Sequence, residues 1–227
     1  MTDLQIIDFE KDKIKIEEYF NEKLGIYLFY NEINKSSIKY KLMHPQNYKA
    51  DLNYNEDLNI YFGTEKNIIY VGCVYGLEVI SLAQSNKNFI YAFEPLYYNY
   101  CLLKQNIIMN KATNVIPYQA FVGNDNCFEV YHNTDDSHLS LLGFNDEIPV
   151  LRLDDYDFED IGLIYFDHSQ MKKIDDGLKG SVETIKKHNP EIIIDTNLDS
   201  PRKFLQKLGY KDVGLEYNQR GGRFIKD

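Results

Sequence analysis

The stretch IIYVGCVYGLEVISLAQSNKNFIYAFEP, residues 68–95, decides the fold of this chain. Residues 67–71 form an apolar, β-branched run that stops at Gly72, as a buried strand does before a turn. A helical pattern follows, and residues 89–93 form a second apolar run, typical of a strand with helices on both faces. This succession of strand, glycine turn, helix and strand predicts half of a nucleotide-binding α/β domain.

The residues around the turn form the predicted cofactor site. Gly72 and Gly76 flank a tight turn at a helix N-terminus, where a ligand can approach bare backbone. Glu94 closes the second strand, and a carboxylate at that edge of the sheet is placed to accept both hydroxyls of an adenosine ribose. Cys73, inside the turn, and Pro95, after the carboxylate, are predicted to line the same site.

The spacing of the glycines indicates which cofactor to expect. A dinucleotide fingerprint has the form GxGxxG, whose central glycine lets a pyrophosphate approach the backbone. Cys73 and Val74 follow Gly72, so this glycine is missing and a dinucleotide oxidoreductase is a distant alternative. A cofactor without phosphate fits better, and we expect S-adenosylmethionine, which carries a ribose and an amino acid.

Length and charge limit the organisation and the partners. The chain has 227 residues, enough for one α/β domain, predicted over residues 63–227, with an N-terminal helix and small hairpin over residues 1–62. Its net charge of −10 argues against nucleic acid, because phosphate binding requires clustered Lys and Arg. The expected partner is a small molecule or a glycan, and the sequence indicates no oligomeric state.

Cysteine usage and hydropathy indicate a compartment. Cys73, Cys101 and Cys127 lie far apart with no CxxC spacing, which is typical of reduced thiols in a cytosolic protein. The opening MTDLQIIDFE lacks the cationic start and apolar core of a signal peptide, and no apolar run is long enough to span a bilayer. We therefore expect a cytoplasmic protein with no membrane partner.

The whole chain alternates between strand and helix patterns. Helices are predicted over about residues 13–24, over a segment that starts at residue 76, over a segment after Pro95 that ends at about residue 110, and over residues 175–188 and 199–208. Strands are predicted over residues 67–71, 89–93, 114–121, 127–131, 150–153, 163–166, 192–194, 213–217 and 223–225. This order predicts a mostly parallel sheet with one antiparallel edge, closed by a C-terminal hairpin.

Two loops hold further candidate residues. A turn at Gly123 follows the third strand and borders the expected adenine site, so Asn124 or Asp125 could bond the adenine amine; a plain surface turn is the alternative. The loop over residues 133–147 is long for a compact domain and carries His138. That histidine faces the substrate or is a solvated loop residue.

Several motifs resemble those of the FkbM family of S-adenosylmethionine-dependent methyltransferases, in the same order along the chain. YVGCVYG resembles the family's DVGANIG, and YAFEP resembles its VYAFEP. LLKQNIIMNKATNV resembles LLKxNIxxNxxxNV, LIYFD resembles the start of IKIDVEG, and KFLQKLGYK resembles LLKxLGY. Together these motifs extend over about residues 68–225.

The resemblance implies a class I methyltransferase fold, with sheet order 3 2 1 4 5 7 6 and helices on both faces. It implies O-methylation of a hydroxyl on a sugar or another small metabolite. Tyr70 replaces the acid that opens the first motif, Val74 replaces its asparagine, and Ser169 replaces a glutamate. A catalytically inactive relative that acts in binding or assembly is therefore the alternative.

Asp167 and His168 are the predicted catalytic residues. Methyl transfer is an in-line displacement, so the protein positions the acceptor and removes its proton. Both residues follow a predicted strand at the edge where ligands bind, and a histidine can act as a base near neutral pH. A buried carboxylate bonded to nearby backbone is the alternative for Asp167.

A metal ion is a less favoured route to the same reaction. Asp167 and Asp195 end neighbouring strands, and FDH with IIIDTN also resembles the Mg²⁺ site of catechol-type O-methyltransferases. Thr196 stands where that site has asparagine, and Asn197 comes one place late. Carboxylates at neighbouring strand ends need not share an ion, so Mg²⁺ is possible but not expected.

Overall fold

The computed structural model describes residues 26–33, 38–45, 65–85, 87–131, 146–167, 174–214 and 221–226. The predicted helix over residues 13–24 lies outside these ranges, as do His138 and His168. No helix in the described ranges is long and apolar enough to cross a bilayer.

Seven strands form the central sheet. They are β3 (Asn67–Val71), β4 (Ile90–Phe93), β5 (Val115–Tyr118), β9 (Ile161–Phe166), β10 (Glu191–Ile194), β11 (Lys211–Asp212) and β12 (Gly222–Ile225). Each of the five parallel strands is a short run of apolar residues, because both faces of the sheet are covered. The predicted strand over residues 67–71 is confirmed to the residue.

The sheet is mixed, with the order β5-β4-β3-β9-β10-β12-β11. The strand numbers differ from the expected order 3 2 1 4 5 7 6, because the labels count every strand of the chain, including those of the other two sheets. Numbered along the chain within this sheet alone, the seven strands follow 3-2-1-4-5-7-6. The antiparallel strand was expected at the edge, but β12 runs antiparallel to both β10 and β11 and so lies one place inside it.

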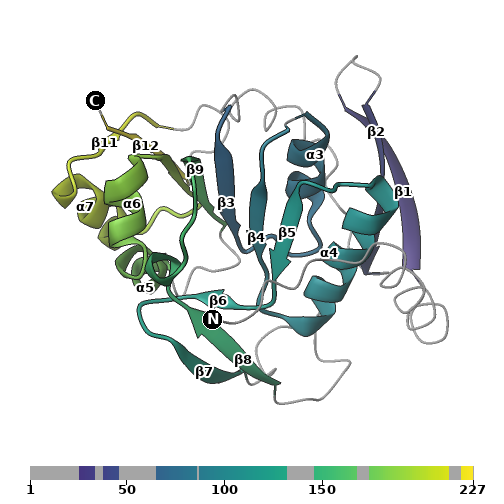
Figure 1. Cartoon of the computed structure of the whole chain (residues 1–227), viewed down its shortest axis with the longest axis horizontal. Helices are drawn as coiled ribbons and strands as arrows, with labels where there is room; N and C mark the ends of the chain where they lie inside the picture. The colour runs from purple at the N-terminus through teal and green to yellow at the C-terminus, as the bar shows by residue number, and fades with distance from the viewer. Residues whose placement is uncertain are drawn as a thin grey trace.

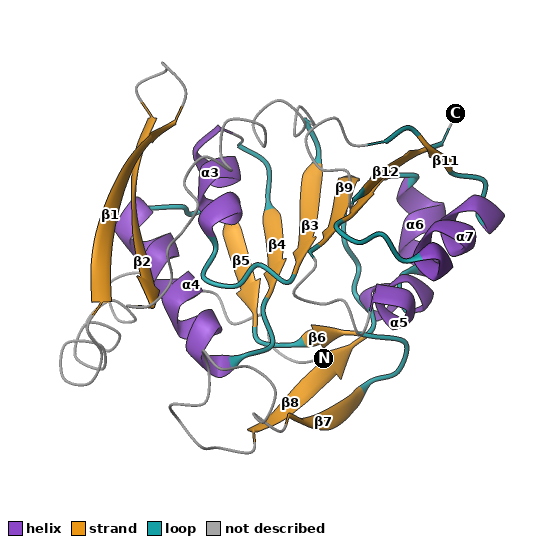
Figure 2. Ribbon diagram, turned by 180° about the vertical axis from the view of Figure 1, so that it is seen from behind, coloured by secondary structure: helices purple, strands orange, loops and turns teal. Residues whose placement is uncertain are grey.

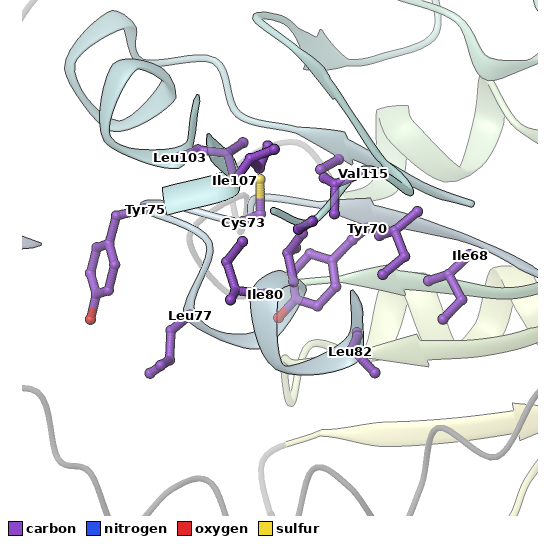
Figure 3. Packing of buried hydrophobic residues seen from close by; sticks show 14 of the residues in the cluster. Ile68, Tyr70, Cys73, Tyr75, Leu77, Ile80, Leu82, Leu103, Ile107 and Val115 are labelled. Carbon is purple, nitrogen blue, oxygen red and sulfur yellow. The ribbon is translucent and has the colours of Figure 1, made fainter. Parts of the chain in front are cut away.

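Helices cover both faces of the sheet, as Figures 1 and 2 show. The helices α3 (Leu77–Ser85) and α4 (Tyr97–Asn110) pack on the face formed by Ile68 and Tyr70. The helices α5 (Ile174–Lys179), α6 (Val182–His188) and α7 (Asp199–Lys207) pack on the opposite face, formed by Ile69 and Val71. Alternate residues of one strand thus belong to two separate cores, and Figure 3 shows the first of them.

A second, three-stranded sheet lies at the end of the central sheet where the parallel strands finish (Figure 1). Its strands are β6 (Phe121–Val122), β8 (Asp146–Leu151) and β7 (Cys127–Tyr131), with β8 in the middle. The predicted strand over residues 114–121 was wrong in extent: the chain leaves the central sheet after Tyr118, and Phe121 pairs instead with Val150. A short 3₁₀ helix, η2 (Leu153–Asp155), replaces the end of the predicted strand over residues 150–153.

An antiparallel hairpin precedes the central sheet, formed by β1 (Ile26–Ile33) and β2 (Ile38–Pro45). It lies within the N-terminal region for which a small hairpin was predicted. The strand β2 lies against α4, on the side of this helix that does not face the sheet (Figure 1).

The predicted helix over residues 175–188 is two helices, α5 and α6, separated at Gly180 and Ser181. A Cβ atom on Gly180 would lie 1.9 Å from the carbonyl oxygen of Gly123. Two backbone segments therefore meet here without a side chain between them, and the helix breaks at this contact.

The C-terminal hairpin begins earlier than predicted. Lys211 pairs with Ile225 and Asp212 with Phe224, whereas a first strand over residues 213–217 was expected. Val213 still donates a backbone hydrogen bond to the carbonyl of Arg223, at 2.8 Å, but neither Val213 nor Gly214 is part of a strand, and residues 215–217 of the predicted strand lie outside the described ranges. Phe224, which pairs with Asp212, is fully buried, whereas Val213, just beyond β11, is 49% exposed.

Candidate functional site

The glycine loop between β3 and α3 has three residues with positive φ: 87° at Gly72, 50° at Val74 and 83° at Gly76. The N–H of Gly72 donates to the carbonyl of Phe93 at 2.8 Å, which joins the loop to the end of β4. The N–H of Gly76 donates to the carbonyl of Cys73 at 2.7 Å and closes the turn. The loop thus lies at the carboxyl ends of the neighbouring strands β3 and β4, as expected for a ligand site of this fold.

Val74 is the unusual member of this loop. A left-handed conformation costs an L-residue roughly 1–2 kcal/mol, and a β-branched side chain is among the least suited to it. Val74 occupies the place of the asparagine in the motif that YVGCVYG resembles, and asparagine tolerates this conformation. The loop therefore has a backbone conformation that suits asparagine, and Val74 adopts this conformation under strain.

Glu94 is held at the carboxyl end of β4 by three hydrogen bonds. Its carboxylate accepts from the backbone N–H of Val74 at 2.8 Å, from that of Leu96 at 2.9 Å and from the side chain of Asn99 at 3.3 Å. The residue is only 2% exposed, and burial raises its pKa from 4.5 to about 8, against the effect of these donors. The predicted ribose-binding carboxylate thus lies beside the glycine loop and is bonded to it.

Cys73 and Asp167 lie near Glu94. The thiol of Cys73 donates to the carbonyl of Phe93 at 3.4 Å, and burial raises its pKa well above the usual value, with Glu94 and Asp167 adding to the shift. Asp167 follows β9, and its N–H donates to the carbonyl of Val71 at 2.9 Å. Because Asp167 also raises the pKa of Glu94, the two acids lie within electrostatic reach of each other.

Tyr70 stands where the resembled motif has an acid. Its ring is fully buried and stacks on Tyr165, with the ring centroids 4.5 Å apart and the planes at 19°. Its hydroxyl has no hydrogen-bond partner among the residues that the structure describes. Burial raises its pKa well above the usual value, so the neutral phenol supplies no negative charge beside the loop. Figure 3 shows this ring within the core under α3.

The remaining predicted cofactor residues take different positions. Pro95 is buried directly after Glu94. Asn124 and Asp125 follow the contact between Gly123 and Gly180, where Asn124 Cα would lie 3.2 Å from a Cβ on Gly180. Asp125 is exposed. The structure therefore places this turn against the junction of α5 and α6, and its contact with adenine stays a prediction.

The residues proposed for Mg²⁺ lie at the ends of β9 and β10. The N–H of Asp195 donates to the carbonyl of Phe166 at 2.9 Å, so Asp195 is adjacent to Asp167 in the sheet. Thr196 accepts a hydrogen bond from the N–H of Leu198 through its hydroxyl, at 3.3 Å. Asn197 is exposed. In the described ranges no group of three or more His, Cys, Asp or Glu side chains is arranged to hold a metal ion.

A hollow of about 400 Å³ lies elsewhere, between η2 and α6. It is lined by Asp154, Asp155, Tyr156, Asp157, Glu183, Thr184, Lys187 and His188. The ammonium of Lys187 already pairs with Asp157 at 2.8 Å, and Asp154 accepts from the N–H of Thr184 at 2.8 Å. The hollow is near the starts of β9 and β10, away from the glycine loop, so we do not assign the ligand to it.

Two asparagines of α4 were missed in the sequence. Asn99 bonds Glu94, and Asn106 donates to the carbonyl of Tyr75, in the glycine loop, at 2.7 Å. Asn106 lies in LLKQNIIMN, within the stretch that resembles LLKxNIxxNxxxNV. An amide at a helix position that packs inward could have indicated a bond to backbone.

Comparisons with known proteins bear on this fold. No family model and no curated protein matches the sequence. Among solved structures, methyltransferase FkbM from Methylobacillus flagellatus matches with a TM-score of 0.53 and 17% identity, over 70% of this chain and 43% of that chain. The chain has a Rossmann-like methyltransferase fold.

Two further structures accompany this match. A protein in the NADB-Rossmann superfamily from Streptococcus agalactiae gives a TM-score of 0.50 and 17% identity, over 74% of this chain and 64% of that one. M. jannaschii TYW2 in complex with AdoMet gives a TM-score of 0.48 and 15% identity, over 90% and 88%. The chain spans less than two thirds of the length of the first two structures.

Proposed function

We propose that the chain binds S-adenosylmethionine at the ends of β3 and β4 and transfers its methyl group to a hydroxyl. The observation that carries the proposal is the position of Glu94, which accepts a hydrogen bond from Val74 at 2.8 Å and so lies beside the glycine loop. A carboxylate in that place is suited to the hydroxyls of a ribose. The backbone of Gly72, Cys73 and Gly76 would lie along the same ligand.

The residues favour a ligand without phosphate. A pyrophosphate requires bare backbone at the centre of the loop, where Val74 carries a branched side chain. Asp167 lies within electrostatic reach of Glu94, and an acid beside the site disfavours an anionic ligand. S-adenosylmethionine has an adenosine and a positive charge, and when bound it supplies an electrophilic methyl group.

Asp167 is the proposed base of the reaction. As the oxygen of the acceptor bonds to the methyl group, the hydroxyl loses its proton, which a carboxylate at the end of β9 would accept. His168 follows in the sequence and is proposed as a second candidate for that proton.

The acceptor that we propose is a sugar or another small metabolite. A net charge of −10 disfavours nucleic acid as the acceptor, because its phosphates would be repelled. The motifs that resemble those of the FkbM family motivate the choice of an O-methyltransferase, and membership of that family is part of the proposal. We expect the protein to act in the cytoplasm, without a membrane partner.

Calorimetry with S-adenosylhomocysteine tests the cofactor site. We expect the wild type to bind and Glu94→Ala to bind at least about tenfold more weakly, because two hydroxyl contacts are lost. Glu183→Ala is the matched control, since Glu183 is an exposed carboxylate on α6 that pairs only with Lys186 in the described structure. No binding by the folded wild type at millimolar ligand rejects the proposal.

A second candidate is a binding or assembly protein without catalysis. The Tyr70 ring, stacked on Tyr165, favours it, because no charged group remains at the position of the motif's acid. Methylation of any acceptor by the purified protein, lost in Asp167→Ala, would reject this candidate. Binding of S-adenosylhomocysteine without any methyl transfer would favour it.

A further inference from the structure

One buried face of α4 contacts both parts of the proposed site. Asn99, Leu103 and Asn106 are separated by four and then three residues, so they project from the same side of the helix. The two asparagines are 8% and 0% exposed, and Leu103 is fully buried between them. A polar pair on a buried helix face requires hydrogen-bond partners.

Asn106 finds its partner in the glycine loop. Its side-chain amide donates to the carbonyl of Tyr75 at 2.7 Å, across 31 residues of sequence. Tyr75 comes directly before Gly76, where the loop turns into α3. A carbonyl buried in a loop needs a hydrogen-bond donor, and the side chain of Asn106 donates to this one.

The same face makes two more contacts with the site. A Cβ on Gly76 would lie 2.3 Å from Cδ1 of Leu103, so α4 packs directly on the turn. Asn99 donates to the carboxylate of Glu94 at 3.3 Å. One helix thereby sets the positions of the loop and of the carboxylate relative to each other.

We infer that Asn106 is a positioning residue of the adenosine site, which holds the glycine loop through the Tyr75 carbonyl in the shape that directs the Val74 N–H toward Glu94. The inference rests on the proposed function for its consequence, the affinity for ligand. The geometry of the loop itself is independent of any ligand and can be tested without one.

Hydrogen exchange in the ligand-free protein tests the loop. We expect Asn106→Ala to raise exchange at the amides of Val74 and Gly76 by about three- to tenfold, the effect of losing one hydrogen bond, and to leave β9 and β10 unchanged. Asn106→Asp keeps the shape of the side chain but places an acceptor against the carbonyl. A positioning bond predicts that Asp is at least as disruptive as Ala; a packing role alone predicts that Asp behaves like the wild type.

Gln105→Leu is the matched control, because Gln105 is a neighbour on α4, is 2% exposed, and its Oε1 has no hydrogen-bond partner among the described residues. It should leave exchange in the loop unchanged. Unchanged exchange in both Asn106 variants, or a uniform rise across the sheet, overturns the inference.

Titration with S-adenosylhomocysteine then tests the consequence. We expect Asn106→Ala to weaken binding about three- to tenfold and Gln105→Leu to leave it unchanged. Equal binding by the wild type and Asn106→Ala overturns the inference and leaves the proposed function standing. Absence of binding by the wild type rejects the proposed function, while the exchange result still decides the role of Asn106 in the loop.

Discussion

The carboxylate of Glu94 accepts a hydrogen bond from the backbone N–H of Val74 at 2.8 Å. This contact joins the loop after β3 to the end of β4, with Val74 held at a φ of 50°. Val74, the strained residue of the loop, and Glu94, whose pKa is raised, are therefore direct partners. Predictions about either residue concern the same site.

Val74→Asn should stabilise the protein. Asparagine tolerates the left-handed conformation that valine opposes, so we expect the free energy of unfolding to rise by about 1 kcal/mol in urea denaturation. Val74→Thr is the control, because threonine is also β-branched and gains nothing from the backbone. A loss of stability in the asparagine variant would show that apolar packing of Val74 outweighs the strain.

Tyr70→Phe should not destabilise the protein and should gain up to about 1 kcal/mol. The variant removes a buried hydroxyl without a partner among the described residues and keeps the ring stacked on Tyr165. Tyr210→Phe provides the contrast, because the Tyr210 hydroxyl donates to the carbonyl of Pro190 at 2.9 Å and its loss should cost about 1 kcal/mol. Thermal melts of the two variants should therefore shift in opposite directions; a Tyr70→Phe melt as low as that of Tyr210→Phe contradicts the assignment.

Glu94 should make stability fall as pH rises. Burial raises its pKa from 4.5 to about 8, so between these values the folded chain binds a proton that the unfolded chain has lost. Its contribution is full below the unfolded pKa and is lost as pH rises through the folded one. The change is on the order of 5 kcal/mol at most, at about 1.4 kcal/mol per pH unit.

Urea unfolding of the wild type and Glu94→Gln between about pH 5 and about pH 8 measures this effect. The variant should show a shallower decline in unfolding free energy, whatever its absolute stability. Glu183→Gln, at an exposed carboxylate, should retain the wild-type slope. Identical slopes in all three proteins would mean that Glu94 titrates as an ordinary carboxyl group.

Gly180→Ala should be strongly destabilising, because the added Cβ would lie 1.9 Å from the carbonyl oxygen of Gly123. We expect a cost of about 3 kcal/mol from the forced separation of the two backbones. Gly214→Ala separates this steric clash from the cost of a positive φ. Gly214 has a φ of 76°, and a Cβ on it would meet no described atom within 4 Å. That variant should cost only about 1 kcal/mol. Equal losses would refute a steric role for Gly180.

The local part of the fold could be predicted from the sequence. The strand over residues 67–71 is bounded by Gly72, and its apolar run has the length of a buried strand. The position of Glu94 at the end of β4 followed in the same way from the run before it. Such features depend on neighbours in sequence, which the pattern of residues records.

Contacts between distant segments could not be predicted in this way. The break at Gly180 arises from the approach of Gly123, which directly follows β6 of the three-stranded sheet. The strand β12 lies one place inside the edge, where Phe224 pairs with Ile192 of β10 on one side and with Asp212 of β11 on the other. Propensity and periodicity do not contain these tertiary contacts.

The sequence predicted several residues of the site but not the hydrogen bonds that join them. Glu94 was expected to bind a ribose, and its hydrogen bonds to Val74, Leu96 and Asn99 depend on a loop shape that the sequence does not specify. The role of Asn106 required the same knowledge, because its partner is a backbone carbonyl. Side chains that bond backbone leave no pairing signal in a single sequence.

A structure of the protein with S-adenosylhomocysteine bound tests the central claim most directly. The account predicts that the ribose hydroxyls lie within hydrogen-bond distance, about 2.6–3.2 Å, of the Glu94 carboxylate, with the sulfur directed toward Asp167. An adenosine bound elsewhere, for example in the hollow beside α6, would contradict it. So would a complex in which the space between Glu94 and Asp167 stays filled by protein side chains.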